Sequence, residues 1–412
     1  MNTLAKVCSF ALLAGLGTAA IVVAGPLTPP GGPVASTYKT LTEVEPRIAI
    51  NATNTPGDAT STYVITLPGS YYLTGNLAAA NGKAAVRIAS SRVTIDLNGF
   101  TVSSGVSSTF GFTTGNTGYQ HISIQNGAIQ QFTGGGINLN SCDYSRITGV
   151  RVNAGGQGID AGSSAMVTDC VVSGTSGNGI MVYSASRVAR CLSSENTGHG
   201  FVVGNSSCAF EQCTASQNMG DGFQTNNSLL TDCVSDTNDG NGFLGSYADN
   251  FQHCRAGYNK KTGFVASNLA MFDSCSSLQN SQLGISMGNT GTARNCVISS
   301  NSLQGIKATD RCTIVNNDVR YNGGVVYAGI WCNGDYNHVE SNRSNGNAYG
   351  IYVGGTNNVV IKNDVSNSDL VNYYIIAGNR VGPVVSGSTN AAINGNSGGG
   401  LGFTDTNANF AY

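Results

Sequence analysis

The sequence predicts an all-β fold, a solenoid of short parallel strands wound from one chain, and three observations support it. A Gly-Ile or Gly-Phe step recurs about every 21 residues through the middle of the chain. Cysteine and asparagine recur with the same period, and a fixed period of this length is the signature of a solenoid. Glycine supplies 56 of the 412 residues and charged residues only 10%, as expected for a chain with many tight turns.

The apolar residue of each Gly-Ile or Gly-Phe step marks one coil, and we call these residues the anchors. The anchors are Ile137, Ile159, Ile180, Phe201, Phe223, Phe243, Phe264, Ile285, Ile306, Ile330 and Ile351. Apolar and polar residues alternate around them in short runs, which favours β-strands over the leucine-rich helical repeats of similar length. Three short strands fit a coil of this length, and stacked coils lie about 4.8 Å apart. The anchors predict about 11–13 coils within residues 61–378.

Two further columns share this period. The first contains Cys170, Cys191, Cys213, Cys233, Cys254, Cys275 and Cys296, and passes to Asn317, Asn342 and Asn363. The second contains Asn196, Asn218, Asn238, Asn259, Asn280 and Asn301. Stacked neighbours lie about 4.8 Å apart, whereas bridged Cβ atoms lie about 3.8 Å apart, so disulfides along the column need local distortion. We therefore expect the cysteines to be small buried apolar residues and the asparagines to hydrogen-bond between coils.

The ends of the chain differ in composition from the repeats. Residues 1–24 have the pattern of a cleavable signal peptide, a short start with one lysine and an apolar run that ends in small residues. An uncleaved membrane anchor is the alternative, and both predict an exported protein without a later membrane span. Residues 25–39 form a Pro/Gly-rich linker, 40–60 an N-terminal cap and 379–412 an irregular tail or cap. The net charge of −2 does not favour nucleic acid as a partner.

The 21-residue coil, the asparagine columns and the internal Ile/Val/Phe column resemble the right-handed parallel β-helix of the pectin lyase-like superfamily. The resemblance covers about residues 60–380 and implies a single-stranded right-handed parallel β-helix. The segments "LTEVEPRIAI", "VTIDLNGFTV" and "TDTNANFAY" more narrowly resemble exported bacterial, planctomycete-type β-helix repeat proteins. This resemblance implies a protein that is secreted or held in the cell envelope and has a polysaccharide partner. It specifies the fold and leaves the reaction open.

The turns before successive anchors hold the ionisable residues that could carry catalysis. His199 precedes one anchor step and Asp221 the next, so stacking places them about 5 Å apart. Asp239, Lys260 and Lys261 occupy nearby turn positions of the following coils. A carboxylate beside a histidine suits general acid–base chemistry. Such residues are also common in turns because they tolerate unusual backbone angles.

The residues that follow the anchors are expected to face outward on one sheet, and they offer a second candidate site. Lys307, Trp331 and Tyr352 occupy this strip on three successive coils. Trp331 is the one tryptophan of the chain, and exposed rings are flat apolar surfaces on which sugars stack. A ring ladder that only shields the sheet is the alternative. The strip holds one aspartate, Asp160, so calcium remains open as a ligand while no other metal or cofactor is indicated.

Two functions remain open on the sequence. The first is a non-catalytic exported protein that binds extracellular or cell-envelope polysaccharide. The second is a polysaccharide lyase, glycoside hydrolase or epimerase acting on such a glycan. The turns are short apart from insertions near residues 323–327 and 370–374, whereas enzymes of this kind wall their clefts with long loops. That pattern favours the binding protein.

Overall fold

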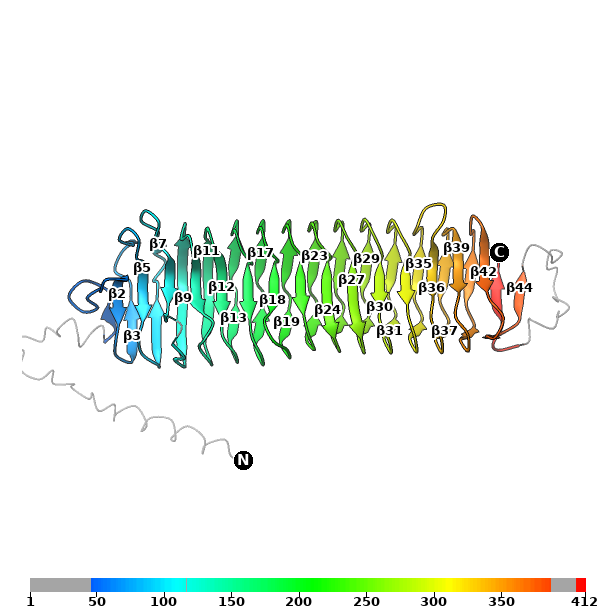
Figure 1. The fold of residues 1–412 in the computed structure, drawn as a ribbon, viewed down its shortest axis with the longest axis horizontal. Coiled ribbons are helices and arrows are strands. Elements are labelled where there is room, and N and C mark those ends of the chain that lie inside the picture. The colour runs from blue at the N-terminus through cyan, green and yellow to red at the C-terminus, as the bar shows by residue number, and fades with distance from the viewer. Residues whose placement is uncertain (1–45, 116, 387–404) are drawn as a thin grey trace, which may run out of the picture. The chain divides into compact units, whose positions relative to one another are not determined.

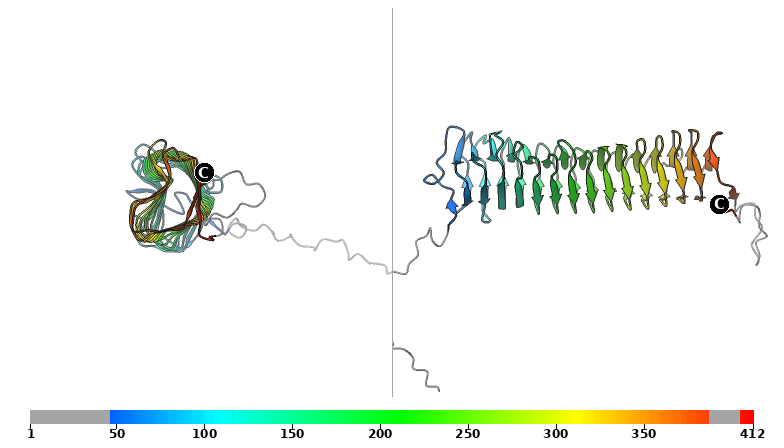
Figure 2. Two further views of the ribbon diagram at one scale, coloured as in Figure 1. Left: turned by 90° about the vertical axis from the view of Figure 1, so that its right-hand side faces the viewer. Right: turned by 90° about the horizontal axis from the view of Figure 1, so that it is seen from below.

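The computed structural model describes residues 46–115, 117–386 and 405–412, and Arg47–Tyr412 forms one compact unit. The predicted signal peptide and linker, the first residues of the predicted cap and residues 387–404 of the predicted tail lie outside the described residues. The unit is a rod of stacked coils (Figure 1), and the view along its axis shows the strands of successive coils superposed (Figure 2). The described residues include no helix that could span a membrane.

Each regular coil contributes one strand to each of three faces, and the ladder pairings within a face are parallel. The first face is a sheet of fifteen strands that contains the anchors. Its strands are β2 (Ser61–Ile65), β5 (Ala84–Ile88), β8 (Phe110–Thr113), β10 (Gly135–Leu139), β12 (Gln157–Ala161), β15 (Ile180–Val182), β18 (Phe201–Val203), β21 (Phe223–Thr225), β24 (Phe243–Tyr247), β27 (Phe264–Asn268), β30 (Ile285–Met287), β33 (Ile306–Ala308), β36 (Ala328–Cys332), β39 (Tyr349–Val353) and β42 (Val371–Ile375).

The other two faces meet at the cysteine column, and two long strands run through both of them. The second face contains β1 (Ile48–Ala49), β3 (Gly69–Tyr72), β6 (Val93–Asp96), β13 (Met166–Thr168), β16 (Arg187–Ala189), β19 (Ala209–Glu211), β22 (Leu229–Thr231), β25 (Asn250–Gln252), β28 (Met271–Asp273), β31 (Thr292–Arg294), β34 (Thr313–Val315), β37 (His338–Glu340), β40 (Val359–Ile361) and β43 (Arg380–Val381). The third face contains β4 (Leu77–Ala78), β7 (Thr101–Ser103), β14 (Val171–Ser173), β17 (Leu192–Ser194), β20 (Thr214–Ser216), β23 (Val234–Asp236), β26 (Arg255–Gly257), β29 (Ser276–Leu278), β32 (Val297–Ser299), β35 (Asp318–Arg320), β38 (Arg343–Asn345), β41 (Asp364–Ser366), β44 (Val384–Ser386) and β45 (Asn409–Ala411). The long strands are β9 (Ile122–Gln130) and β11 (Arg146–Asn153).

The anchors confirm the predicted period. All eleven are buried and lie opposite one another in the first face. That face has fifteen strands, more than the 11–13 coils expected, because β2, β5, β8 and β42 also stack on it. The anchor positions of the first three of these strands are Tyr63, Val86 and Phe112. Two of these residues do not follow a glycine, so the Gly-Ile/Phe step misses their coils.

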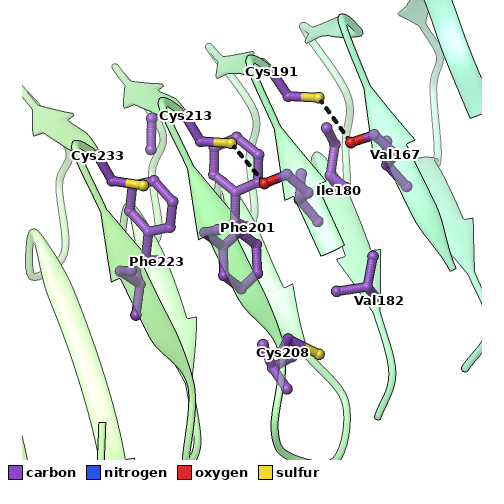
Figure 3. Packing of buried hydrophobic residues seen from close by; sticks show 14 of the residues in the cluster. Val167, Ile180, Val182, Cys191, Phe201, Cys208, Cys213, Phe223 and Cys233 are labelled. Atoms are coloured by element: carbon purple, nitrogen blue, oxygen red, sulfur yellow. Dashed lines mark hydrogen bonds between the residues drawn. The ribbon is translucent and has the colours of Figure 1, made fainter. Parts of the chain in front are cut away.

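Aromatic rings and thiols fill the interior. Phe201, Phe223, Phe243 and Phe264 form a continuous stack with ring centroids 4.7–4.8 Å apart, which matches the spacing of the coils. The cysteine side chains point into the same interior (Figure 3). All eleven cysteines of the described residues are buried and unpaired, as expected for small apolar residues of the core. Burial raises the pKa of the Cys275 thiol well above its usual value.

Asparagine side chains link the coils at one corner. In each step the Oδ1 atom accepts hydrogen bonds from the backbone N–H and the Nδ2 amide of the previous asparagine, as between Asn238 and Asn259 at 3.1 and 3.0 Å. The predicted column from Asn196 to Asn301 follows this rule and continues to Asn322 and Asn347. These buried amides are therefore satisfied, as a core of this kind requires.

Three residues of each regular coil adopt a left-handed backbone, one at every corner. In the coil of Phe201 they are Ser207, Gln212 and Gln217, with φ of 63°, 53° and 56°. Their N–H groups donate to carbonyls of the next coil, at 3.0–3.2 Å. Left-handed residues without glycine are uncommon and cost energy, so their repetition shows that the stacked hydrogen bonds determine the corner.

Both ends of the helix are built from strands. Near the N-terminus β1 pairs with β3, and Pro56 bridges Tyr63 of β2 in antiparallel fashion, which covers the first edge of the sheet. Beyond Gly378, where the sequence suggests an irregular tail, β43, β44 and β45 continue the second and third faces. The 21-residue period did not predict these strands, because Asn409 continues the column of Asn363 after 46 residues.

Candidate functional site

The turn that contains His199 is a hydrogen-bonded column. The Nδ1 atom of His199 lies 3.3 Å from Oδ2 of Asp221 and accepts the backbone N–H of Asp221 at 2.9 Å. His199 itself donates its backbone N–H to Oδ1 of Asn178, and Asn241 donates to Oδ1 of Asp221, at 2.9 and 2.6 Å. His199 and Asp221 thus serve as two steps of a structural column.

The electrostatics of Asp221 follow from that column. Burial raises the pKa of Asp221, but the His199 ring and the two Asn241 donors outweigh it, and the pKa falls below its usual value. The other predicted catalytic residues lie on the surface. Asp239 and Lys260 form an exposed ion pair at 2.8 Å, and Lys261 is exposed. The structure therefore brings His199 and Asp221 together, and Asp239 with Lys260, as two pairs. Their catalytic role remains a prediction.

The outward strip of the first face is continuous and changes in character along the helix. Its residues, one per coil, are Val64, Arg87, Thr113, Asn138, Asp160, Met181, Val202, Gln224, Leu244, Val265, Ser286, Lys307, Trp331, Tyr352 and Tyr374. The beginning of the strip is polar, the middle is apolar and the end is aromatic. Strand pairing places Lys307, Trp331 and Tyr352 on neighbouring coils, as the period predicts.

The aromatic end of the strip encloses a pocket of about 230 Å³, which we call the aromatic pocket. It is lined by Gln304, Val326, Tyr327, Ala328, Trp331, Tyr349 and Tyr352. Trp331 and Tyr352 meet edge to face with centroids 6.4 Å apart, and Tyr349 meets Tyr352 in the same way at 5.6 Å. Trp331 and Tyr349 thus stand perpendicular to the Tyr352 ring, whereas Tyr374 of the next coil stacks on it, so this end of the strip holds both pocket walls and a short ladder.

The loop at 323–327 and one cation complete this site. Val326 is 57% exposed and Tyr327 ends the loop that the insertion creates, so the insertion deepens the face at this coil. The Nζ atom of Lys307 lies 5.2 Å from the centre of the Trp331 ring. No carboxylate of the described residues forms an ion pair with Lys307. The pocket therefore combines aromatic side chains with Gln304, and the positive charge of Lys307 lies against Trp331, one of its lining residues.

Asp160 is a second unusual residue of the same strip. Burial raises the pKa of its carboxyl group to about 7, and its Oδ1 atom is buried without a hydrogen-bond partner in the described residues. Its neighbour across the sheet is Met181, whose sulfur lies 3.9 Å from the Tyr183 hydroxyl. Asp160 lies seven coils from Lys307, a separation of about 34 Å. No cluster of three metal-ligating side chains forms around it or elsewhere in the residues that the structure describes.

Of the residues that line the pocket, the sequence analysis proposed only Trp331 and Tyr352, and among those it missed is Tyr349. It also missed Tyr374, which lies next to Tyr352 on the strip. Tyr349 occupies the turn position before Gly350, the position that His199 and Gln304 hold in their coils. Counting two coils onward from Gln304 at this turn position leads to Tyr349. Tyr374 stacks on Tyr352 with centroids 4.5 Å apart and interplanar angle 11°, but its coil lacks the Gly-Ile/Phe step.

The chain is a right-handed parallel β-helix. Residues 135–271 match the family model of the right handed beta helix region. No curated protein matches the sequence. The A-module of mannuronan C-5 epimerase AlgE4 from Azotobacter vinelandii is 16% identical, with a TM-score of 0.48 over 76% of this chain and 91% of that one.

Two further solved structures are similar to this chain. The catalytic unit of a GH87 α-1,3-glucanase from Streptomyces thermodiastaticus is 14% identical, with a TM-score of 0.46 over 79% of this chain and 69% of the glucanase. A tailspike protein mutant of E. coli bacteriophage HK620 is 12% identical, with a TM-score of 0.45 over 89% of this chain and 78% of the tailspike.

Proposed function

We propose that this protein is an exported, non-catalytic binding protein for an acidic polysaccharide, which it holds at the aromatic pocket. The observation that carries the proposal is the pocket itself, in which Trp331, Tyr349 and Tyr352 form walls beside Lys307. Aromatic rings with polar edges suit the apolar faces and hydroxyl groups of sugars. Because Lys307 has no carboxylate partner in the described residues, a uronate or sulfate group of the ligand would be its natural counterion.

The shape of the first face supports an extended ligand. The strip crosses the stacked strands, one residue per coil, parallel to the axis of the helix. A linear polymer bound in the pocket can therefore extend over the neighbouring coils. Ser286 and Val265 occupy the same strip on the two coils before Lys307. Both side chains are half-buried. A polymer therefore gains contacts on several coils, whereas a monosaccharide gains only those of the pocket.

The proposal is tested by calorimetric titration of the protein with uronate, sulfated and neutral polysaccharides. We expect binding of acidic polysaccharides, about tenfold weaker in Trp331→Ala, because one well-packed ring contributes about 1.4 kcal/mol. Lys307→Gln should lose the preference for acidic over neutral chains. Tyr247→Ala, which removes an exposed tyrosine outside the pocket, is the matched control and should bind normally. Equal affinity in Trp331→Ala and the unmodified protein would refute the assignment of the pocket.

A second candidate function, a polysaccharide-modifying enzyme, is favoured by one observation, the carboxyl group of Asp160. A group with a pKa of about 7 both donates and accepts protons readily near neutral pH. If the protein acts on polysaccharide, incubation with uronate polymers should produce unsaturated ends or epimerised residues. Near-ultraviolet absorbance and NMR detect these products, and Asp160→Asn should abolish them. Unchanged polymer after prolonged incubation with the unmodified protein would rule out this second function for the polymers tested.

A further inference from the structure

The C-terminal strand lies between two strands that the repeat would otherwise place side by side. Strand β45 pairs in parallel with β41 through Asp364 and Phe410, and with β44 through Val385 and Phe410. The order in the third face is therefore β41, β45, β44. In Figure 1 the C-terminus lies at the same end of the helix as β44, which comes before it in the sequence. The last strand in the sequence is therefore the second-to-last strand in the third face, and β44 is the last.

The sequence period shows that β44 has been displaced. Asp364 of β41 and Val385 of β44 both lie opposite Phe410 of β45, and they are 21 residues apart. The same separation joins Arg343 and Asp364, which pair directly in the third face. Without β45, strand β44 has the spacing to pair with β41 in the ordinary way. Strand β45 is therefore inserted between two strands that the repeat would otherwise pair. We call the position between β41 and β44 the slot.

The inserted strand supplies a residue that the last coil lacks. In the corner column of Asn342 and Asn363, the position 21 residues later is Val384, which lies opposite Asn409 and has no side-chain amide. Asn409 replaces it. The Oδ1 atom of Asn409 accepts the backbone N–H of Asn363 at 3.0 Å and its Nδ2 amide at 3.2 Å.

Further contacts hold β45 in the slot. The Nδ2 group of Asn409 donates to the carbonyls of Val360 and Gly382, both at 3.1 Å. Asn409 is fully buried, and Ala408 and Ala411 are buried beside it. The Tyr412 hydroxyl donates to Oδ2 of Asp364 at 2.9 Å. The slot thus recognises this short C-terminal segment by backbone pairing and by one buried asparagine.

The connection to β45 is longer than the geometry needs. Residues 387–408 join β44 to β45, which is 22 residues by position. A crossover between adjacent parallel strands needs about a dozen residues. A chain of 22 residues reaches up to about 70 Å when extended, far beyond one coil. The C-terminal strand can therefore reach an equivalent slot on a neighbouring molecule.

We infer that the slot between β41 and β44 accepts the C-terminal strand of a second copy of this chain, and that two copies pair by exchanging residues 405–412. The contacts of β45 are the same whichever copy provides it, because they involve only the strand and the slot. Reciprocal exchange gives a closed pair with two-fold symmetry at the C-terminal ends. A strand on its own chain has a high effective concentration, so the unmodified protein is mainly monomeric and pairs when it is concentrated.

The test is the oligomeric state of the full chain and of a variant with a shortened connection, by size-exclusion chromatography with light scattering. Deletion of residues 388–401 leaves eight residues between β44 and β45, too few for the crossover within one molecule. We expect this variant to be dimeric, and Asn409→Ala in the same background to weaken the dimer at least tenfold. An excess of a peptide of residues 405–412 should dissociate the dimer. Circular dichroism establishes that each variant retains its β-structure.

If the shortened variant does not fold, strand exchange is tested on the unmodified chain. Isotope-labelled and unlabelled protein are incubated together at high concentration and examined by native mass spectrometry. Mixed dimers that are lost on addition of the peptide support strand exchange. A folded shortened variant that stays monomeric overturns the inference. Dimers that resist both the peptide and Asn409→Ala also overturn it, and so does a complete absence of mixed dimers of the unmodified chain.

Discussion

The imidazole of His199 shows how polar side chains are used in this solenoid. It accepts the N–H group of the next coil through Nδ1, in the way that Asn178 accepts through its amide oxygen. The sequence places His199 beside Asp221, and the structure agrees with that position. The direction of the hydrogen bond could not be predicted, because a histidine nitrogen can donate or accept and the choice depends on the backbone opposite.

A buried carboxyl group gives this protein a pH-dependent stability. Asp249 is 1% exposed, and burial raises its pKa to about 6 although its Oδ1 atom accepts the N–H of Ser228. The folded chain therefore holds this proton more tightly than the unfolded chain. Stability from this group is complete below pH of about 4, falls as the pH rises to about 6, and stays low above that.

We predict that Asp249→Ser removes this dependence. Serine occupies the same corner three coils earlier, where Ser186 accepts the N–H of Ala165 at 3.0 Å. A serine at 249 can therefore replace the acceptor without the buried charge. At pH 8 the variant should be more stable than the unmodified protein by up to about 3 kcal/mol, with little difference at pH 4. Urea unfolding at both pH values measures this. Asp239→Ser, an exposed control, should change stability by less than about 1 kcal/mol. Equal gains at both pH values would contradict the mechanism.

The asparagine column is the element that holds one corner of the coils in alignment. Its members are almost fully buried, and each joins two neighbouring coils through both the side chain and the backbone. The sequence predicts this column because five residues separate it from the cysteines in nearly every coil. The left-handed corners were not predictable in the same way. Residues such as Tyr258 and Leu269 occupy them, and neither residue type favours that backbone.

We predict that Asn259→Ala destabilises the helix by about 3 kcal/mol or more. The substitution leaves the Asn238 amide and backbone N–H without their acceptor, and the carbonyl of Ser235 loses a donor. Buried polar groups without partners carry the full cost of desolvation. Thermal unfolding followed by circular dichroism checks the effect. Ser281→Ala, at the exposed residue that directly follows Asn280 of the next coil, should alter stability by no more than about 0.5 kcal/mol. If the two variants unfold alike, the column is not a principal source of stability.

The unit formed by Arg47–Tyr412 is a scaffold that presents one long strip, with the aromatic pocket at the aromatic end of that strip. Fifteen stacked strands give the first face a length of about 65–70 Å. A fixed period determines most of this architecture, so the sequence alone predicts the middle coils well. It fails where contacts are not periodic. The pairing of Asn409 with Asn363 spans 46 residues, and the coils of Tyr63 and Val86 lack the glycine that marks the others.

The aromatic pocket is only partly predictable for the same reason. Trp331, Tyr352 and Lys307 follow the anchors and are found by counting. The pocket also needs Tyr349 and the loop that ends at Tyr327, and the insertion that forms this loop interrupts the period. A regular repeat specifies a flat strip, whereas a departure from the repeat creates a cavity. The candidate site lies where the repeat is broken.

The most direct measurement of the proposed function is the fluorescence of Trp331, because the chain has one tryptophan and it lines the pocket. We predict that an acidic polysaccharide shifts and quenches this emission in a saturable titration. High salt should weaken the response because Lys307 is a surface charge. A neutral polysaccharide of the same length should produce a weaker response. Emission that remains unchanged while calorimetry reports binding would place the glycan elsewhere and contradict the assignment.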